Sequence, residues 1–369
     1  MGGNMGGQGP MRKGYSASGA GYSPSTVDNR QLAYMNRFNV ITNQVSLLVQ
    51  QLNQTSRNVT DIDDALNRLP TRIQQIRKMN YRVMMNLEKD VASLSERWSL
   101  AKPNVASIIG STAPVLVSEG RTIENELAQR RFSSNYDVSQ LSSVEARVST
   151  FQAYVSDFSS RVSGATGDTL NKIHSLDRDV GVAERTLSLT SISSFKWKQG
   201  ESPILSVKAK DLNADAEGVL SLTNQRFIYE SEKEVVLKKT FFIATQKKKI
   251  RETTVDRPIG MIDNIVKGRV GILAGQGLYV TFKPDSGQQE MKLDTDGEDA
   301  DLVLRFHNFI SNGEADQELD ATEGSKTDER PSVPIVCPRC SAPYSEEIYR
   351  GQTSLQCKYC GATIPVSSN

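Results

Sequence analysis

The chain has 369 residues, and its 44 Lys and Arg residues nearly balance its 43 Asp and Glu residues. A net charge of +1 gives no global attraction to nucleic acid or to an anionic membrane. This length allows two or three domains, and no apolar run approaches the roughly 18–20 residues needed to cross a bilayer. Aromatic residues make up only 7% of the chain, which favours long exposed helices over one large core.

The N-terminal segment 1–26 is rich in Gly, Ser and Met, and such a composition cannot bury a core. We expect a disordered tail, with a sticky interaction segment as the alternative. Nothing at the N-terminus reads as a secretory signal. A cytoplasmic protein is therefore expected, with peripheral membrane contact if its basic residues bind lipid.

Apolar residues follow at steps of four and three from Tyr34 to Leu69, and the same phase continues beyond Pro70. A heptad pattern sustained over about five repeats is typical of a coiled coil. Because the phase survives Pro70, we interpret this proline as a kink inside one long helix. A second apolar seam runs from Leu141 to Leu187.

Between these two seams lies the segment 102–115, which contains two prolines and a glycine. Such helix breakers predict a turn. Since the flanking stretches are nearly equal in length, residues 27–190 are expected to form an antiparallel helical coiled-coil hairpin. Each arm would extend ~110 Å at a rise of ~1.5 Å per residue. Weak periodicity near 130–135 and 164–167 predicts bends or gaps in these two segments.

The tip of this hairpin would carry four apolar side chains: Ile108, Ile109, Val115 and Leu116. These residues either dock on a partner or a membrane, or they cap the end of the rod. A two-helix rod also leaves apolar surface uncovered. We therefore expect a homo-oligomer, such as a four-helix dimer.

The helical period ends after Leu189, and residues 191–312 alternate apolar and polar side chains in short segments. Apolar residues at helical spacing in 300–310 predict one closing helix. Many strands with one amphipathic helix describe a small barrel or sandwich with a helical plug. The segments predicted as strands are 204–207, 218–222, 226–230, 235–245, 277–282 and 290–293.

Two stretches, 197–201 (WKQGE) and 218–229 (GVLSLTNQRFIY), resemble the start of a pleckstrin-homology or GRAM-like domain. In that family a Leu-Thr-Asn-x-Arg turn leads into the next strand, and 258–265 is similar to a later strand. The resemblance covers about a third of the chain. It implies a small β-barrel with a C-terminal helix, and a fold rather than a ligand. We expect Arg226 to hydrogen-bond backbone carbonyls across the turn.

Basic residues gather in one part of this domain: Lys238, Lys239, Lys247, Lys248, Lys249 and Arg251. A cationic hairpin of this kind can hold phosphoinositide or other anionic headgroups. A solvated strand edge protected by lysines predicts the same residues. Both interpretations stay open. The following segment, 313–332, is strongly acidic and is expected to be an extended, flexible linker.

All four cysteines form two C-x-x-C pairs separated by sixteen residues: Cys337, Cys340, Cys357 and Cys360. This spacing is typical of four thiolates around one tetrahedral Zn²⁺, with disulfides as the main rival. Neither His lies near them in the sequence. The site is therefore expected to be closed and structural, since a catalytic zinc keeps one position open for water.

The C-terminal residues 333–369 resemble a zinc ribbon of the widespread CPxCG…CxYCG kind. Gly361 follows the fourth cysteine, and Ser341 stands where the first knuckle often has glycine. Leu355 and Ile364 are expected to form a small apolar face. A module this short has no core without metal, so metal binding and folding should be one event.

Motifs of known enzymes are absent from the sequence, which predicts a non-enzymatic protein within a multidomain α+β architecture. The first hypothesis is a cytoplasmic adaptor or scaffold that binds protein or membrane partners. The alternative is a nucleic-acid-associated regulator that uses the zinc ribbon. Arg339, Arg350 and Lys358 are a thin basic set without stacking aromatics, so nucleic acid is not the expected partner. A third hypothesis, a ligase or transferase role, requires an open zinc position.

Overall fold

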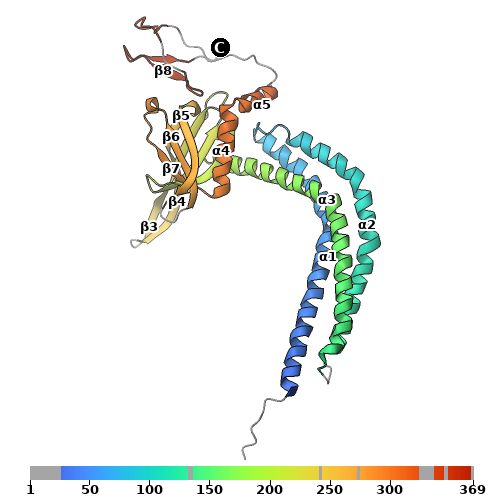
Figure 1. The fold of residues 1–369 in the computed structure, drawn as a ribbon. Helices are drawn as coiled ribbons and strands as arrows, with labels where there is room; N and C mark the ends of the chain where they lie inside the picture. Colours follow the sequence, from blue (N-terminus) through green and yellow to red (C-terminus); the bar gives the residue numbers. More distant parts are fainter. Residues whose placement is uncertain are drawn as a thin grey trace, which may run out of the picture. The chain divides into compact units, whose positions relative to one another are not determined.

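The computed structural model divides into two compact units, one of Met1–Val59 with Pro103–Thr166 and one of Thr60–Lys102 with Gly167–Asn369. Of the tail predicted at 1–26, only Thr26 lies among the described residues. Three long helices contribute to both units: α1 (Thr26–Lys78), α2 (Leu87–Arg130) and α3 (Ser142–Thr190) (Figure 1). The structure describes residues 26–131, 136–240, 243–271, 275–323, 336–344 and 348–366.

In the first unit, segments of all three helices pack on one another. Arg37 of α1 forms an ion pair with Glu145 of α3, and Arg147 of α3 pairs with Glu119 of α2 at 2.7 Å. Gly120 of α2 lies directly against α1 and α3. Buried apolar side chains at heptad spacing fill the seam, among them Tyr34, Phe38, Ile41, Val45, Leu116, Ile123, Val148 and Val155.

The helical part of the second unit repeats this arrangement. The Trp98 indole of α2 donates a 2.8 Å hydrogen bond to Asp63 of α1. Arg72 of α1 donates hydrogen bonds of 2.8 and 2.7 Å to the two carboxylate oxygens of Glu184 in α3. Pro70 lies inside α1, as the continuous apolar phase predicts.

The predicted turn at 102–115 is wrong, because α2 passes through this segment as helix. Pro103 and Pro114 each remove one helical hydrogen bond, at a cost of about 3 kcal/mol per proline. Burial of Val105 and Leu116 on the other helices offsets this cost. The expected helical hairpin is therefore replaced by three helices.

The expected hairpin tip is likewise wrong. Ile108 and Ile109 are partly buried in the middle of α2, where Leu116 is buried and Val115 is exposed. Helix α1 ends at Lys78 and α2 begins at Leu87, whereas α2 ends at Arg130 and α3 begins at Ser142. Residues 132–135 of the gap predicted near 130–135 lie outside the described residues. No gap interrupts the helix at 164–167, because α3 passes through this segment. Asn80, shortly after the end of α1, has a φ of 64°, which is typical of a helix C-terminus.

The second unit also contains one antiparallel sheet of seven strands, in the spatial order β4-β3-β2-β1-β7-β6-β5. Helix α4 (Gly297–Ser311) follows the last strand and packs beside β1, β2, β5 and β6 (Figure 1). Strands and short helices are β1 (Pro203–Asp211), β2 (Ala216–Thr223), β3 (Arg226–Thr240), β4 (Ile243–Pro258), η2 (Ile259–Met261), β5 (Ile262–Val270), β6 (Gly275–Phe282), η3 (Pro284–Ser286) and β7 (Met291–Asp294).

Period-two patterning predicted most of these strands, and the closing helix is confirmed as α4. The predicted strand 235–245 is two strands, because β3 ends at Thr240 and β4 begins at Ile243. Within the described residues no register joins the edge strands β4 and β5, so the sheet is open. The predicted closed barrel is therefore not confirmed. We refer to residues 203–311 as the sheet domain.

The acidic segment after the sheet domain differs from the expected extended linker. Residues Glu314–Glu323 form helix α5, in which Ala315 and Leu319 are buried one turn apart. The Glu318 carboxylate accepts hydrogen bonds from the backbone amides at 84 and 85, before α2. Burial of this apolar face and the hydrogen bonds of the Glu318 carboxylate thus keep the segment helical, although its charge alone predicts an extended chain. Residues 324–332 of the predicted linker lie outside the described residues.

The last described segments, 336–344 and 348–366, form what we call the cysteine module. Its strands β8 (Ser354–Gln356) and β9 (Thr363–Pro365) are antiparallel, with Leu355 opposite Ile364. Both side chains are at most 4% exposed, which confirms the small apolar face predicted from the sequence.

Candidate metal centre

Two tight knuckles of the same design present the four cysteines. In the first, the Cys337 amide donates to the Ala342 carbonyl and the Ser341 amide donates to the Cys337 carbonyl, both at 2.8 Å. The second knuckle repeats both bonds at Cys357 and Gly361, with lengths of 2.9 and 2.8 Å. Each turn therefore holds its two sulfurs on one side of the backbone.

Each knuckle requires a left-handed residue after its second cysteine. Ser341 has a φ of 59° and Gly361 a φ of 69°. Glycine adopts this region freely, whereas for a residue with a Cβ it costs about 1–2 kcal/mol. The structure thus explains why the sequence pattern places glycine after each pair, and it shows that Ser341 fills that position under strain.

Two of the sulfur–sulfur distances in the cluster are close to the edge of a metal tetrahedron. Sγ of Cys337 lies 3.7 Å from Sγ of Cys360, and Sγ of Cys340 lies 3.6 Å from Sγ of Cys357. All four cysteines are free, since a disulfide would bring two sulfurs to about 2.05 Å. Sulfurs that surround Zn²⁺ at about 2.3 Å lie about 3.8 Å apart along each edge. The donor set is compatible with a structural zinc site.

No further ligand joins this cluster among the described residues. The four sulfurs lie within 4.8 Å of one another, and no His, Asp or Glu belongs to the group. Four protein ligands complete the tetrahedral coordination of zinc and leave no position for water or substrate. The geometry therefore favours a structural centre over a catalytic one.

Hydrogen bonds within the cluster shift the pKa values of two of its thiols in opposite directions. Burial raises the pKa of Cys337, but hydrogen bonds from the backbone amides of Arg339 and Cys340 prevail and lower it to about 6. The backbone amide of Ala342 lowers the pKa of Cys340, but contacts with the thiols of Cys360, Cys337 and Cys357 raise it to about 12. Several thiolates at these distances repel one another unless a positive ion lies between them.

The predicted basic cluster maps to the long β3–β4 hairpin. In its register Lys238 lies opposite Gln246, and Lys247 lies opposite Val236. The side chains of 234–240 and 243–249, and so of all five lysines, lie outside the described residues.

Arg251 does not belong to a free basic surface. Its side chain is 6% exposed and donates hydrogen bonds to Glu232 at 3.2 Å and to the Leu189 carbonyl at 2.6 Å. Arg251 therefore ties the sheet domain to the end of α3. The sequence signal for this role is the Glu232 that pairs with Arg251 across the hairpin.

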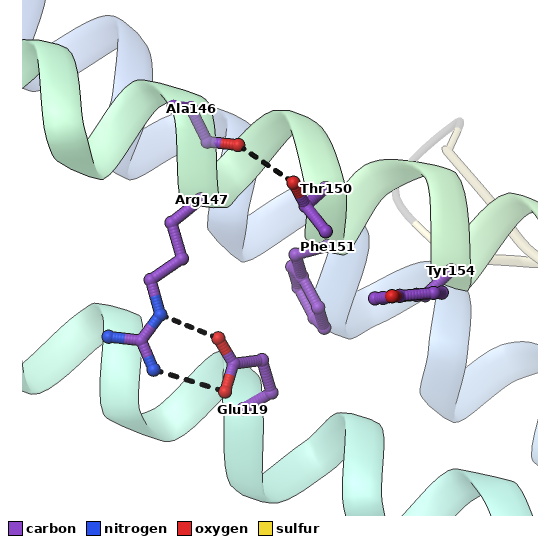
Figure 2. Close-up of a pocket in the computed structure, with 6 residues that line it drawn as sticks. All are labelled: Glu119, Ala146, Arg147, Thr150, Phe151 and Tyr154. Carbon is purple, nitrogen blue, oxygen red and sulfur yellow. Dashed lines mark hydrogen bonds and ion pairs between the residues drawn. The ribbon is translucent and has the colours of Figure 1, made fainter.

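The first unit contains a shallow groove of about 290 Å³ between α2 and α3. Figure 2 shows Arg147 joined to Glu119 by two hydrogen bonds, of 2.7 and 3.1 Å, beside Phe151 and Tyr154. The Thr150 hydroxyl donates to a helix carbonyl in the same groove. Sequence reasoning missed the groove because it placed Glu119 and Arg147 in the same arm of a helical hairpin, whereas they lie on the separate helices α2 and α3. Its ion pair and aromatic rings supply packing and no catalytic base.

Neither histidine has a catalytic setting in the described structure. His174 is exposed on α3. Burial in α4 lowers the pKa of His307, whose Nε2 lies 3.5 Å from the Ser311 hydroxyl. Among the described residues, no helix combines the length and apolarity that a membrane span requires.

No family model matches the chain, and no curated protein matches it either. Sixteen chains of solved structures do match. Autoinhibited Vav1 is 9% identical, with a TM-score of 0.25, over 92% of this chain and 67% of that chain. A mutant of the DH/PH domains of p115-RhoGEF is 10% identical, with a TM-score of 0.19, over 81% of this chain and 99% of that chain. Similarity at these scores carries no argument about the fold or function of this protein.

Proposed function

We propose that this protein is a non-enzymatic adaptor whose cysteine module is built around one structural Zn²⁺. The observation that supports this is the cluster of four sulfurs within 4.8 Å of one another, two pairs of which lie at 3.7 and 3.6 Å, close to the edge of a zinc tetrahedron. Cys337, Cys340, Cys357 and Cys360 would be the ligands. Zinc bound there supplies folding free energy to a module whose apolar core is too small to fold alone.

The remaining parts of the chain would supply binding surfaces. The sheet domain, with its pleckstrin-homology or GRAM-like sequence pattern, contacts a protein or a membrane surface. The lysines of the β3–β4 hairpin provide the positive charge that anionic headgroups attract. We place this adaptor in the cytoplasm, with peripheral membrane contact through the hairpin.

A role in nucleic-acid binding receives less support than protein or membrane binding. Of the three basic residues of the ribbon, Arg350 directs its guanidinium to acceptors within this chain. Arg339 and Lys358 are the other two basic residues of this segment. Proteins that bind a single nucleic-acid strand follow its phosphates with a row of basic residues and stack aromatic side chains on its bases. Two basic residues without a row of stacking aromatics do not form such a surface.

The zinc proposal is tested by metal analysis of the purified full chain. We expect one zinc per chain, and intense visible absorption of four-thiolate tetrahedral coordination after exchange with Co²⁺. Cys357→Ser should lose the metal, whereas Ser354→Ala, on the exposed face of β8, should retain it. Metal content near zero, or a nitrogen or oxygen ligand in X-ray absorption, would falsify the closed four-sulfur site.

Membrane contact is tested by sedimentation with vesicles that contain phosphatidylserine and phosphoinositides. The triple variant Lys247→Glu, Lys248→Glu and Lys249→Glu should lose most of its vesicle binding, because each basic residue near the surface contributes about 1 kcal/mol. A matched variant changes the charge of three exposed lysines elsewhere: Lys78, Lys89 and Lys208. Equal vesicle binding by both variants would contradict membrane contact through the hairpin, and its lysines would then be interpreted as the solvated edge of the sheet.

A further inference from the structure

The connection between the two knuckles lies against the sheet domain. Within the second unit, Tyr349, Arg350 and Gly351 contact the turn between β2 and β3, the short helix η2 and the ends of α4 and α5. The metal ligands Cys340 and Cys357 lie at the two ends of this connection. A segment of the cysteine module is therefore bound by the neighbouring domain.

Arg350 fills a site made of three separate acceptors. Its Nε donates to the Asn224 carbonyl at 3.1 Å, and Nη2 donates to the Asp316 carboxylate at 2.7 Å. Its Nη1 donates to the Ile310 carbonyl at the end of α4. The side chain is 25% exposed. Acceptors in three directions match the planar fork of a guanidinium and do not match a lysine ammonium.

The backbone beside Arg350 is held as closely as its side chain. The Gly260 amide donates a 3.1 Å hydrogen bond to the Arg350 carbonyl. A Cβ on Gly260 would lie 2.6 Å from the Arg350 nitrogen, and a Cβ on Gly351 would lie 1.7 Å from the Gln225 carbonyl oxygen. Gly351 also has a φ of 78°. Only glycine at both positions permits this approach of the two backbones.

Tyr349 adds a contact on the other side of the arginine. The Lys283 ammonium lies 4.2 Å from the centroid of the Tyr349 ring, within the range of a cation–π interaction. The bound segment thus presents three consecutive residues to the neighbouring domain: an aromatic ring, a guanidinium and a glycine. This combination is more specific than surface charge attraction.

We propose that the sheet domain contains a receptor site for a Tyr-Arg-Gly turn, and that residues 349–351 of the cysteine module occupy it as an intramolecular latch. The metal centre controls the latch, because the bound turn lies between the two knuckles and loses its shape when the metal leaves. This control rests on the zinc centre proposed above, whereas the receptor site rests on the contacts of residues 349–351 and does not depend on the metal.

Hydrogen exchange of the full, metal-loaded chain tests the receptor site. Peptides that cover 255–262 report the Gly260 amide, and peptides that cover 348–356 report the bound turn. Arg350→Ala should raise exchange in both by about tenfold or more, the effect of losing charge-assisted hydrogen bonds. Arg339→Ala removes an exposed arginine of the same module and should leave exchange unchanged. Unchanged exchange in a zinc-loaded Arg350→Ala chain overturns the latch.

A second variant separates release of the latch from unfolding of the module. Gly260→Val blocks the site from the sheet domain without touching the cysteine module, and it should raise exchange in 348–356 while one zinc per chain is retained. If Arg350→Ala loses its zinc, its exchange no longer separates release of the latch from unfolding of the module, and Gly260→Val then provides the test of the receptor site. Protection of 348–356 that survives Gly260→Val contradicts the site.

Chelation tests the control by metal. Removal of zinc from the wild-type chain should raise exchange in 255–262 to the level of Arg350→Ala. Unchanged protection of 255–262 after zinc removal overturns metal control. A wild-type chain that binds no zinc but responds to Arg350→Ala supports the receptor site and contradicts the proposed zinc function, so the two failures are distinguishable.

Discussion

Arg226 donates hydrogen bonds of 2.8 and 2.6 Å to the two carboxylate oxygens of Glu201, and neither side chain is more than 3% exposed. Arg226 also donates to Asp256 at 2.6 Å and to the Lys196 carbonyl at 2.8 Å. The arginine of the Leu-Thr-Asn-x-Arg turn therefore fastens the segment before β1 to the start of β3. The sequence predicted backbone carbonyls across the turn as its partners, whereas the structure gives one carbonyl, that of Lys196, and two carboxylates.

Replacing this arginine should be among the most destabilising changes in the sheet domain. We expect Arg226→Ala to lower the free energy of unfolding by about 3–5 kcal/mol, because it leaves the Glu201 carboxylate buried without its partner. Urea unfolding measures the loss, with Arg178→Ala on the exposed face of α3 as the control. A loss below about 1 kcal/mol would show that water reaches Glu201 in the variant.

Two glycines of α2 should respond to alanine in opposite directions. A Cβ added at Gly110 would have no neighbour within 4 Å, whereas at Gly120 it would lie 2.9 Å from Val49 and 3.2 Å from Phe151. Gly110→Ala should stabilise the helix by about 1 kcal/mol. Gly120→Ala should destabilise the first unit by about 1–3 kcal/mol through overpacking. Thermal unfolding of both variants checks the sign, and a gain at Gly120 would contradict the close helix packing.

Acid should weaken the connection between α1 and α2. Hydrogen bonds of 2.7 and 3.0 Å from Arg77 hold the pKa of Glu88 below its usual value. As the pH falls, Glu88 therefore becomes protonated in the unfolded chain before it does in the folded chain. The ion pair makes its full contribution to the free energy of unfolding above about pH 4.3, and this contribution is lost as the pH falls through the lower pKa of the folded chain. Glu88→Gln should flatten the fall of unfolding free energy in that window, and Arg77→Ala should remove the same slope. An unaltered slope in Glu88→Gln counts against the pair.

Substitutions at Ser341 and Gly361, which follow the second cysteine of each knuckle, should change the zinc affinity in opposite directions. Ser341→Gly relieves a left-handed residue and should tighten zinc binding by about 1 kcal/mol, close to fivefold. Gly361→Ala should weaken binding by a similar amount, and Ser341→Ala should leave it unchanged because alanine has the same strain. Competition with a chromophoric chelator measures all three. Equal affinity of Ser341→Gly and wild type would mean that the serine is not strained.

Local patterns predicted the parts of this protein whose structure depends on neighbouring residues. Alternation of apolar residues predicted strands around Leu220 and Phe227, and helical spacing around Phe306 predicted α4. The two C-x-x-C pairs predicted a four-thiolate cluster, and all four sulfurs meet. In each case the spacing of residue types follows directly from the backbone geometry.

Patterns failed where tertiary contacts override local preference. Pro103 and Pro114 predicted a turn, but packing against α1 and α3 keeps α2 helical. The acidic composition of α5 predicted an extended chain, but buried Leu319 and the bound Glu318 hold it in helix. The role of Arg350 was also missed, because its acceptors come from Asn224 and two other distant segments.

The knuckles also change the entropy of the segment between them. A metal ion coordinated by Cys340 and Cys357, as proposed above, would close a loop of sixteen residues. A covalent cross-link of a loop this long removes about 3 kcal/mol of chain entropy from the unfolded state. The turn at Arg350 would then lose less conformational entropy when it binds its acceptors. A small contact area is therefore sufficient to hold it in place.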